Sequence, residues 1–348
     1  MALLNISSPH TSRPGDTGGV MRQVLYALLP GIVLLTWFFG PGHLIQIGIA
    51  AITALACEAL VMVLRKRPVL FYLKDYSALL TAVLLALALP PLCPWWVTVI
   101  ASAFAIIFAK HLYGGMGYNP FNPAMVGFAL VLISFPVAMT TSWTGPAELL
   151  NAKLTFSQSL HFIFSARDGI DAVTMATPLD VYKHQAAMQT SDEIFKQPIF
   201  GSTIAIGWEW ISLAYALGGI YLLWRRIFTW HIPLSVLTAL SICSVIFGWD
   251  ADTHVPLSLH LFTGATMLGA FFIATDPVTA STTPLGKIIY GAGIGILIYV
   301  IRTYGAYPDA IAFAVLLMNF AAAFIDQYTQ PRTYGHNKAK RGLPKGGK

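Results

Sequence analysis

Long apolar runs recur along almost the whole chain, and they constrain its fold more than any other feature. A helix needs roughly 20 apolar residues to cross the hydrocarbon core of a bilayer, and about ten runs approach that length. They cover residues 20–39, 43–64, 77–89, 95–109, 124–138, 208–223, 232–247, 258–273, 288–301 and 310–325. Because backbone groups in lipid must pair within their own segment, the sequence predicts an all-α polytopic membrane protein.

The composition supports this class and excludes others. Hydrophobic residues make up 56% of the chain and charged residues only 10%, whereas soluble domains carry roughly 25% charged residues. The net charge of +6 would suggest nucleic-acid binding in a soluble protein. Here the basic residues fall mostly at the ends of the apolar runs, so we expect a lipid bilayer and no nucleic acid as partner.

The positions of Lys and Arg also predict the orientation. An even number of spans puts both termini on one side, and the positive-inside rule places the basic residues 65–67 and the tail from residue 332 in the cytoplasm. The long polar segment 139–207 then lies outside. The polar start of the chain has no small-residue cleavage site, so we expect no removable signal peptide.

Four parts follow from this pattern: residues 1–138 with five runs, an external insertion 139–207, residues 208–326 with five more runs, and a basic cytoplasmic tail 327–348. Halves with an odd number of helices are related by an axis in the membrane plane, so we expect two inverted five-helix halves.

Breaks and short helices can also be anticipated from the sequence. The third and eighth runs end at Leu89-Pro90-Pro91 and Asp276-Pro277, which favours a helix broken near its end in each half, although chance could produce the same pair. In the insertion, short helices are expected at 156–164 and at 191–195, the second capped by Ser191.

The insertion contains a segment of small and hydroxyl residues, 171–178 (DAVTMATP). As a bare pattern it signals a turn or a helix start. Its spacing Asp-x-x-Thr-x-Ala-Thr, from Asp171 through Thr174 to Thr177, also resembles the acceptor sequence at which a flavin transferase joins the phosphate of FMN to a threonine hydroxyl. Thr177 is the expected acceptor.

A competing tetrapeptide, 263–266 (TGAT), is closer to the core of that acceptor sequence. It lies inside the eighth apolar run, however, and His260 stands where the acceptor sequence has an acid. Small residues there more simply allow close helix packing, so Thr266 is the weaker candidate.

Nearly the whole chain resembles the D subunits of the Rnf electron transport complexes, called Rsx in some bacteria. Five segments carry the resemblance. They are residues 74–81 (KDYSALLT), 112–125 (LYGGMGYNPFNPAM), 171–180 (DAVTMATPLD), 264–281 (GATMLGAFFIATDPVTAS) and 308–317 (PDAIAFAVLL).

This resemblance implies a subunit of an ion-translocating oxidoreductase that couples electron flow between ferredoxin and NAD to ion movement across the inner membrane. It implies FMN bound covalently, by a phosphoester, to the threonine that matches Thr177, and partner subunits that supply nucleotide and iron–sulfur sites. The chain would therefore not be active alone. In some bacteria the related complex instead keeps a redox-sensing regulator reduced.

The sodium-pumping quinone reductase has a similar B subunit, which suggests a second, non-covalent riboflavin within the membrane. The spacing of Asn119 and Asn122 resembles residues at that site, and amides can pair with the polar edge of a flavin ring. Alternatively, the two asparagines, each followed by proline, only shape a turn.

Two acids lie within or next to apolar runs. Glu58 is inside the second run and Asp276 ends the eighth, and an acid in a membrane is costly enough to suggest a role in conducting a proton or Na⁺. Both could instead be hydrated or paired with basic groups near the cytoplasmic surface.

Other functions remain as alternatives. The predicted plan also suits a solute or ion permease without a redox cofactor. The three cysteines, Cys57, Cys93 and Cys243, show no CxxC spacing, so we expect buried small side chains rather than a metal site. A b-type cytochrome lacks facing histidine pairs, and no dinucleotide fingerprint is present.

Overall fold

The described part of the chain is helical throughout. The computed structural model describes residues 17–150, 153–165, 169–186, 188–201, 204–250, 252, 254–305 and 310–331. Within these ranges the only pairing of strand type is an isolated bridge between Thr144 and Thr174. The polar N-terminal residues up to 16 and the basic tail from 332, both expected in the cytoplasm, lie outside the described residues.

Helices occupy all five apolar runs of the N-terminal half. They are α1 (Thr17–Phe39), α2 (Gly42–Leu64), α4 (Ser77–Ala88), α5 (Trp95–Phe104) continued by the π-helix η1 (Ala105–His111), and α6 (Pro123–Ser134) followed by α7 (Pro136–Thr140). A short helix, α3 (Val69–Leu73), lies in the connection before α4.

The C-terminal half follows the predicted runs as well. Its helices are α11 (Trp208–Trp224), α12 (His231–Phe247), α13 (Leu257–Phe262), α14 (Thr266–Leu268), the π-helix η3 (Gly269–Ile273), α15 (Pro284–Tyr304) and α16 (Ile311–Tyr328). The eighth run ends before Asp276-Pro277, as expected. The structure also breaks this run at Thr263–Ala265, a position at which the sequence pattern predicts no break.

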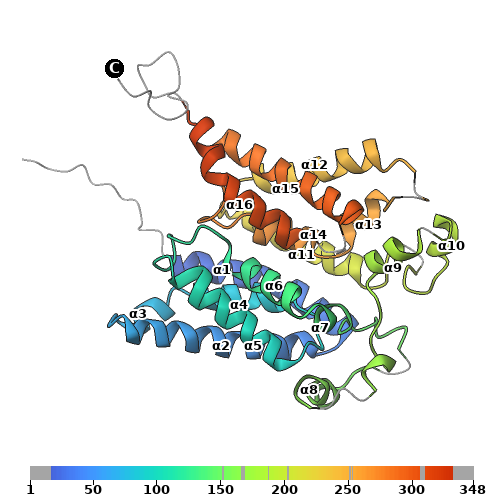
Figure 1. Cartoon of the computed structure of the whole chain (residues 1–348), viewed down its shortest axis with the longest axis horizontal. Helices are drawn as coiled ribbons and strands as arrows, with labels where there is room; N and C mark the ends of the chain where they lie inside the picture. The colour runs from blue at the N-terminus through green and yellow to red at the C-terminus, as the bar shows by residue number, and fades with distance from the viewer. Residues whose placement is uncertain are drawn as a thin grey trace, which may run out of the picture.

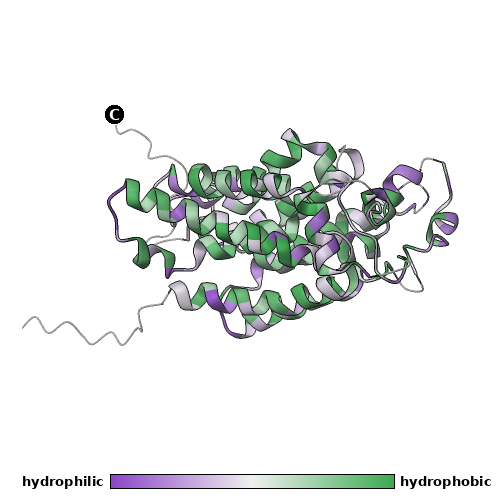
Figure 2. Cartoon of the chain, turned by 90° about the horizontal axis from the view of Figure 1, so that it is seen from below, coloured by the Kyte–Doolittle hydropathy of each residue, from purple (hydrophilic) through white to green (hydrophobic). Residues whose placement is uncertain are grey.

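The surface of the helices is apolar, as a lipid environment requires. Four described helices, α1, α2, α15 and α16, are long and apolar enough to cross a membrane. Large side chains such as Val33, Ile52, Leu217 and Phe320 are exposed on the outside of the bundle, and Figure 2 shows apolar residues along the helices and polar ones in the connecting segments. These features support a membrane protein, while the total of ten crossings stays a prediction.

The two halves meet through two helix pairs, α1 with α11 and α6 with α16. A Cβ atom at Gly218 on α11 would overlap the Ala27 carbonyl oxygen on α1. Glycine therefore permits the close crossing, as small residues do where membrane helices pack. Gly295 plays the same part against Val236 where α15 packs on α12.

The insertion forms a cap at one end of the bundle (Figure 1). It carries α8 (Phe156–Phe164), the 3-10 turn η2 (Ile170–Ala172), α9 (Pro178–Gln185) and α10 (Ser191–Phe195). The two helices anticipated from the sequence are confirmed, but Thr190, not Ser191, is the N-cap residue of α10. Tyr182 and Phe200 form a small core with Val255 and Leu259 of the C-terminal half, so the cap is packed onto the bundle.

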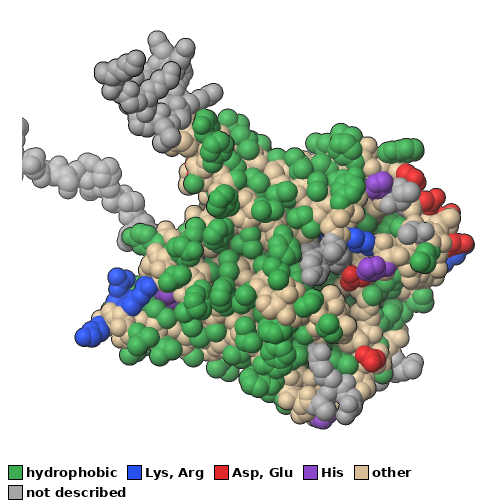
Figure 3. Space-filling view, in the orientation of Figure 1, with side chains coloured by type: hydrophobic (Ala, Val, Ile, Leu, Met, Phe, Trp, Pro, Cys, Tyr) green, Lys and Arg blue, Asp and Glu red, His purple; other side chains and the backbone are tan. Residues whose placement is uncertain are grey.

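Charge is distributed unevenly along the molecule. Figure 3 shows Lys and Arg gathered at the end opposite the cap, and Asp and Glu gathered on the cap. The basic end holds Arg65, Lys66 and Arg67 after α2. This polarity supports the predicted orientation, with the basic end in the cytoplasm.

Candidate functional site

The segment with the flavin-acceptor spacing is held against another part of the cap. The Gly145 amide donates to the Val173 carbonyl (3.1 Å), and the Met175 amide donates to the Trp143 carbonyl (2.9 Å). A Cβ at Gly145 would overlap the Met175 side chain as it lies here, so glycine leaves room for this side chain against the paired segment. Residues 173–175 are thereby held against residues 143–145.

The pairing segment is itself tied to the membrane helices. The Thr144 hydroxyl donates to the Phe39 carbonyl at the end of α1 (3.3 Å), and the Ala147 amide donates to the Phe38 carbonyl (2.7 Å). Segment 171–178 therefore lies at a fixed position next to the Phe39 end of α1.

Thr177 is the N-cap residue of α9, and its side chain is half-buried. Its Oγ1 accepts from the Asp180 amide (3.3 Å) and donates to Asp180 Oδ2 (2.7 Å). The Thr177 amide donates to the same Oδ2 (3.4 Å), which completes a capping box. Ala176 before it is exposed. The expected acceptor hydroxyl thus stands at the surface of the cap and at a helix N-terminus, where phosphate groups bind favourably. A phosphate on Thr177 fits this position if the Asp180 carboxylate turns away.

The other two motif residues contribute to the local turn. Asp171 is exposed in η2, and the Thr174 amide donates to the Ile170 carbonyl (3.1 Å). No hydrogen bond joins either residue to Thr177 within the part of the chain that is described. The structure therefore places the three residues on one segment without a described hydrogen bond between their side chains.

The competing Thr266 is fully buried. Its hydroxyl donates to the His260 carbonyl (2.7 Å) and accepts from Arg302 Nη2 (2.9 Å), while Arg302 Nη1 donates to the same His260 carbonyl (2.8 Å). Arg302 is also buried, at 1% exposure. The hydroxyl of Thr266 is thus committed to holding a buried guanidinium inside the bundle.

The two threonine segments are neighbours in space. Gly264 has φ +62°, and a Cβ there would lie 3.0 Å from Leu179 Cδ1 on α9 and 3.1 Å from Arg302 Nη2. Lys183 on α9 donates to the Gly305 carbonyl at the end of α15. Burial lowers the pKa of Lys183, and the nearby Asp180 carboxylate partly opposes this shift. The cap therefore rests directly on the break in the eighth run.

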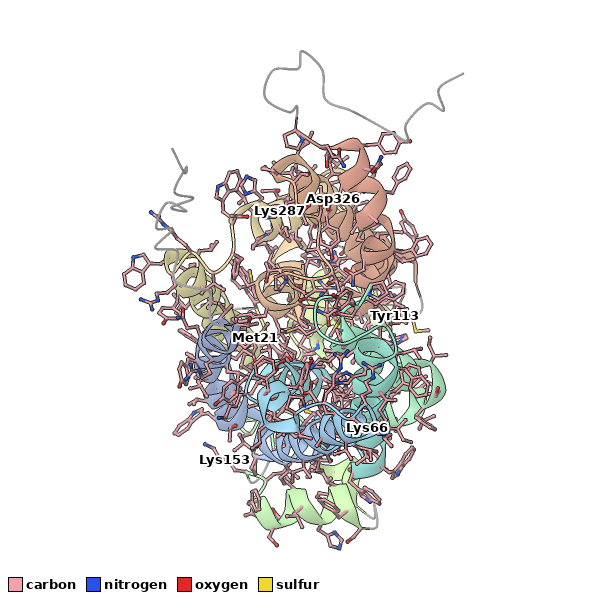
Figure 4. All side chains as sticks on the ribbon, turned by 90° about the vertical axis from the view of Figure 1, so that its left-hand side faces the viewer. Met21, Lys66, Tyr113, Lys153, Lys287 and Asp326 are labelled. Atoms are coloured by element: carbon pink, nitrogen blue, oxygen red, sulfur yellow. The ribbon has the colours of Figure 1, made fainter. Side chains whose placement is uncertain are left out.

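A cavity of about 400 Å³ opens at the basic end of the molecule, between the two halves. Figure 4 looks onto this end and labels two of the lining residues, Met21 on α1 and Lys287 on α15. Apolar walls come from residues such as Leu84, Phe271 and Phe272. Its charged and amide-bearing lining residues are Lys110, Asn119, Asn122, Arg226, Asp276 and Lys287.

Both predicted riboflavin residues line this cavity, but they differ in how their side chains are used. Asn122 caps α6: its Oδ1 accepts from the Ala124 and Met125 amides, and its Nδ2 donates to the Ile273 carbonyl (3.3 Å). Asn119 donates through Nδ2 to the Phe121 carbonyl (3.1 Å), and its oxygen accepts nothing from the described residues. Asn122 thus has a structural role, and Asn119 retains an acceptor for a ligand.

The two candidate ion-path acids occupy different sites. Glu58 is buried and paired with Lys110 and His111, which is the pairing considered as the alternative to a role in ion conduction. Asp276 lies on the cavity wall, half-buried, and accepts from the Thr279 hydroxyl (2.8 Å) and the Val278 amide (3.4 Å). The structure does not bring the two acids into contact.

Sequence reasoning missed Lys110 as a site residue, because it counted this lysine only as a boundary charge. The lysine is buried because η1 continues α5 as a π-helix, with hydrogen bonds five residues apart such as Leu112 to Ile107 (3.0 Å). Such π segments are frequent at functional sites. The only sequence signal for such a role is the Lys110-His111 pair at the end of an apolar run.

Cysteine and histidine do not form a metal site within the described ranges, where no group of three or more potential ligands comes together. The three cysteines are free, and only Cys93 is fully buried, whereas Cys57 and Cys243 are half-buried. His43, His111 and His260 are buried, and His111 lies beside Glu58.

These observations define a class: a helical membrane protein with a ligand-sized cavity between its halves and a surface threonine on a packed cap. The family follows from sequence comparison. The profile of the NQR2, RnfD, RnfE family matches residues 4–335, and the chain belongs to that family.

Similar proteins share almost the full length. The chain is 55% identical over 345 residues to the D subunit of the ion-translocating oxidoreductase complex of Marinobacter nauticus, covering 99% of both chains. It is 51% identical over 349 residues to the protein of that name from Pseudomonas aeruginosa, covering 99% of this chain and 100% of the relative. The Yersinia enterocolitica relative is 52% identical over 349 residues, covering 96% of this chain and 99% of its own.

Proposed function

We propose that this chain is the flavin-carrying membrane subunit of a complex that couples electron transfer between ferredoxin and NAD to ion movement across the cell inner membrane. The observation that carries the proposal is the position of Thr177, half-buried at the N-terminus of α9 on an ordered segment of the cap. Full-length relatives are named as the D subunit of an ion-translocating oxidoreductase complex. Other subunits of such a complex are therefore the partners of this chain.

FMN joined through its phosphate to Thr177 Oγ1 would supply the electron-transfer chemistry. The chain contributes the rigid attachment point. The positive end of the α9 helix dipole favours the phosphate, and the pairing of residues 173–175 with 143–145 fixes its distance from the membrane helices. Asp180 would leave its bond to Thr177, because the carboxylate and the phosphate repel each other.

A second, non-covalent flavin is proposed for the cavity at the basic end. Its volume of about 400 Å³ lies within the range of small-molecule sites. Phe271, Phe272 and Leu84 offer apolar faces to a planar ring, and Asn119 offers an acceptor to its polar edge. The charged residues that line the cavity are three basic ones and one acid: Lys110, Arg226, Lys287 and Asp276. This excess of positive charge suits a ring that gains negative charge on reduction.

The inverted arrangement of the halves remains part of the proposal. Counted along the chain, α1 and α11 are the first helices of the two halves, and α6 and α16 are the fifth. Each of these contacting pairs is therefore unchanged when the two halves are exchanged. The pair α2 with α5 corresponds in the same way to α12 with α15. This pattern of contacts favours a two-fold relation between the halves. The axis lies in the membrane plane if each half crosses the membrane an odd number of times.

Mass spectrometry of the purified chain tests the covalent site. We expect an FMN-sized adduct on the wild type, its complete loss in Thr177→Val, and its retention in the control variant Thr266→Val. A wild type without the adduct, or a Thr177→Val protein that keeps it, would contradict the assignment. A wild type without any flavin, covalent or bound, would favour the permease.

Cysteine labelling in intact cells tests the orientation. Ser157 is exposed on α8 of the cap, and Lys66 is exposed at the basic end. We expect a membrane-impermeant maleimide to label Ser157→Cys from outside and to leave Lys66→Cys unlabelled until the cells are opened. The opposite result would place the cap in the cytoplasm.

A further inference from the structure

A buried ion pair lies beside the cavity at the basic end. Glu58 on α2 is 1% exposed, and its Oε1 lies 2.6 Å from Lys110 Nζ and 3.3 Å from His111 Nε2. Its second oxygen, Oε2, is buried and accepts no hydrogen bond from the described residues. The carboxylate is therefore stabilised mainly by one ammonium group.

Lys110 contacts more than this acid. Its Nζ also donates to Ser77 Oγ (2.7 Å), and Ser77 in turn donates to Asp75 Oδ1 (2.6 Å) at the start of α4. Both Lys110 and Ser77 line the cavity. The ammonium group thus stands in the wall between a buried carboxylate and the space proposed for a redox ring.

Lys110 is close enough to interact both with the Glu58 carboxylate and with a charge in the cavity. Charges attract more strongly inside a protein than in water, because the surroundings screen them less. A negative charge that appears in the cavity competes with Glu58 for the same ammonium. Serine at position 77 offers a neutral second partner, so the lysine can move between the two without losing all its hydrogen bonds.

We propose that Lys110 is a charge-coupling residue, whose ammonium is shared between Glu58 and an electron acceptor bound in the cavity. Negative charge gained in the cavity weakens the Lys110–Glu58 pair and leaves the carboxylate with His111 as its remaining partner. Removal of Glu58 strengthens the pull of Lys110 on the cavity. This inference rests on the second flavin of the proposed function, and it names the residues that set the reduction potential of that flavin.

Redox titration of the purified full chain tests the inference, with flavin absorbance as the readout and Thr177→Val as the background that removes the covalent FMN. In that background we expect Lys110→Met to lower the midpoint potential of the bound flavin and Glu58→Gln to raise it. The expected size is about tenfold in the reduction equilibrium, which is about 59 mV for a one-electron couple. Lys74→Met, an exposed lysine before α4, is the matched control and should change nothing.

A comparison of the double variant with Glu58→Gln keeps the test valid if Lys110→Met alone does not fold. Lys110→Met alone leaves a buried acid without its ammonium, which is strongly destabilising. The double variant Glu58→Gln/Lys110→Met removes both charges, and its midpoint potential should lie below that of Glu58→Gln alone.

The outcomes separate the inference from the function on which it rests. Normal flavin content with equal potentials in the Lys110 and Lys74 variants would overturn the coupling role and leave the proposed function standing. A shift of the same sign in Lys110→Met and Glu58→Gln would overturn it as well. A Thr177→Val protein without any flavin would refute the second flavin itself, and the inference with it.

Discussion

Two threonines that follow an alanine in similar short sequences, Thr177 and Thr266, lie in opposite environments. Thr177 stands half-buried on the cap and caps a helix, whereas Thr266 is fully buried and holds Arg302. The tetrapeptide at Thr266 is the closer match to an acceptor sequence. Exposure and existing hydrogen bonds therefore distinguish the two hydroxyls, which the local sequence pattern alone does not.

The contrast is sharper because the segments touch. Leu179, two residues after Thr177, packs beside Gly264, two residues before Thr266. The segment around Thr177 therefore packs directly on the buried segment around Thr266. Substitutions in and around the two segments test this division of roles.

Gly264→Ala should destabilise the protein by about 2 to 5 kcal/mol. The left-handed backbone costs a non-glycine residue about 1–2 kcal/mol, and crowding in a packed region adds about 1–3 kcal/mol. Thermal unfolding in detergent measures the effect. Gly48→Ala is the matched control, because a Cβ there meets nothing within 4 Å and alanine favours a helix. Equal unfolding temperatures for the two variants would show that the cap does not rest on Gly264.

Thr266→Val should cost about 1 to 3 kcal/mol, since it leaves a donor of buried Arg302 unsatisfied. Thr177→Val should cost less, about 1 kcal/mol, for the loss of a helix cap. Chemical denaturation of both proteins without flavin gives the comparison, with Thr266→Ser as the control that keeps the hydroxyl. A larger cost at position 177 would reverse the roles assigned to the two residues.

Asp180→Ala should loosen the start of α9 by about 0.5 kcal/mol, because the capping box loses its acid near the helix N-terminus. Hydrogen exchange of the amides in residues 178–185 should quicken in protein without FMN. With FMN attached to Thr177 the effect should shrink, since the phosphate replaces the carboxylate. Glu193→Ala, the same change in the capping box of α10, should affect α10 alone.

Tyr182→Phe should have the smallest effect, confined to alkaline pH. Burial, followed by the charges of Asp252 and Asp250, raises the pKa of Tyr182 from its usual value near 10 to about 12. A raised pKa in the folded state gives stability that is complete below pH 10 and is lost as pH rises toward 12. Unfolding temperatures at pH 9 and pH 11 should therefore fall further in the wild type than in Tyr182→Phe. Equal falls would mean that the phenol is solvated in the folded protein.

The sequence predicted what depends on local pattern. The hydropathy of runs 20–39 and 43–64 placed α1 and α2 within a few residues, and the small helix at 156–164 was found as well. The break at Thr263–Ala265 was missed because small residues there also suit close helix packing and the run contains no proline. Gly264, with φ +62°, lies close to Leu179 and Arg302, and these neighbours are distant in the sequence.

For the candidate site, too, local features were predicted from the sequence and long-range contacts were not. The segment 171–178 signalled a helix start, and Thr177 is the N-cap of α9. The partnership of Glu58 with Lys110 could not be foreseen, because the two residues are 52 positions apart and lie on different helices. Nor did the sequence show that Asn122 would be used as a helix cap while Asn119 keeps an acceptor for a ligand.

The direction of the Lys110 side chain depends on the number of residues in the π-helix η1. Successive residues of a regular α-helix are separated by about 100° around its axis, so one residue more or fewer before Lys110 swings its side chain by about a quarter of a turn. Within Ala105–His111, substitution and deletion should therefore behave very differently. A shortened η1 that regains regular α-helical pairing would carry an intact lysine on the wrong side of the helix.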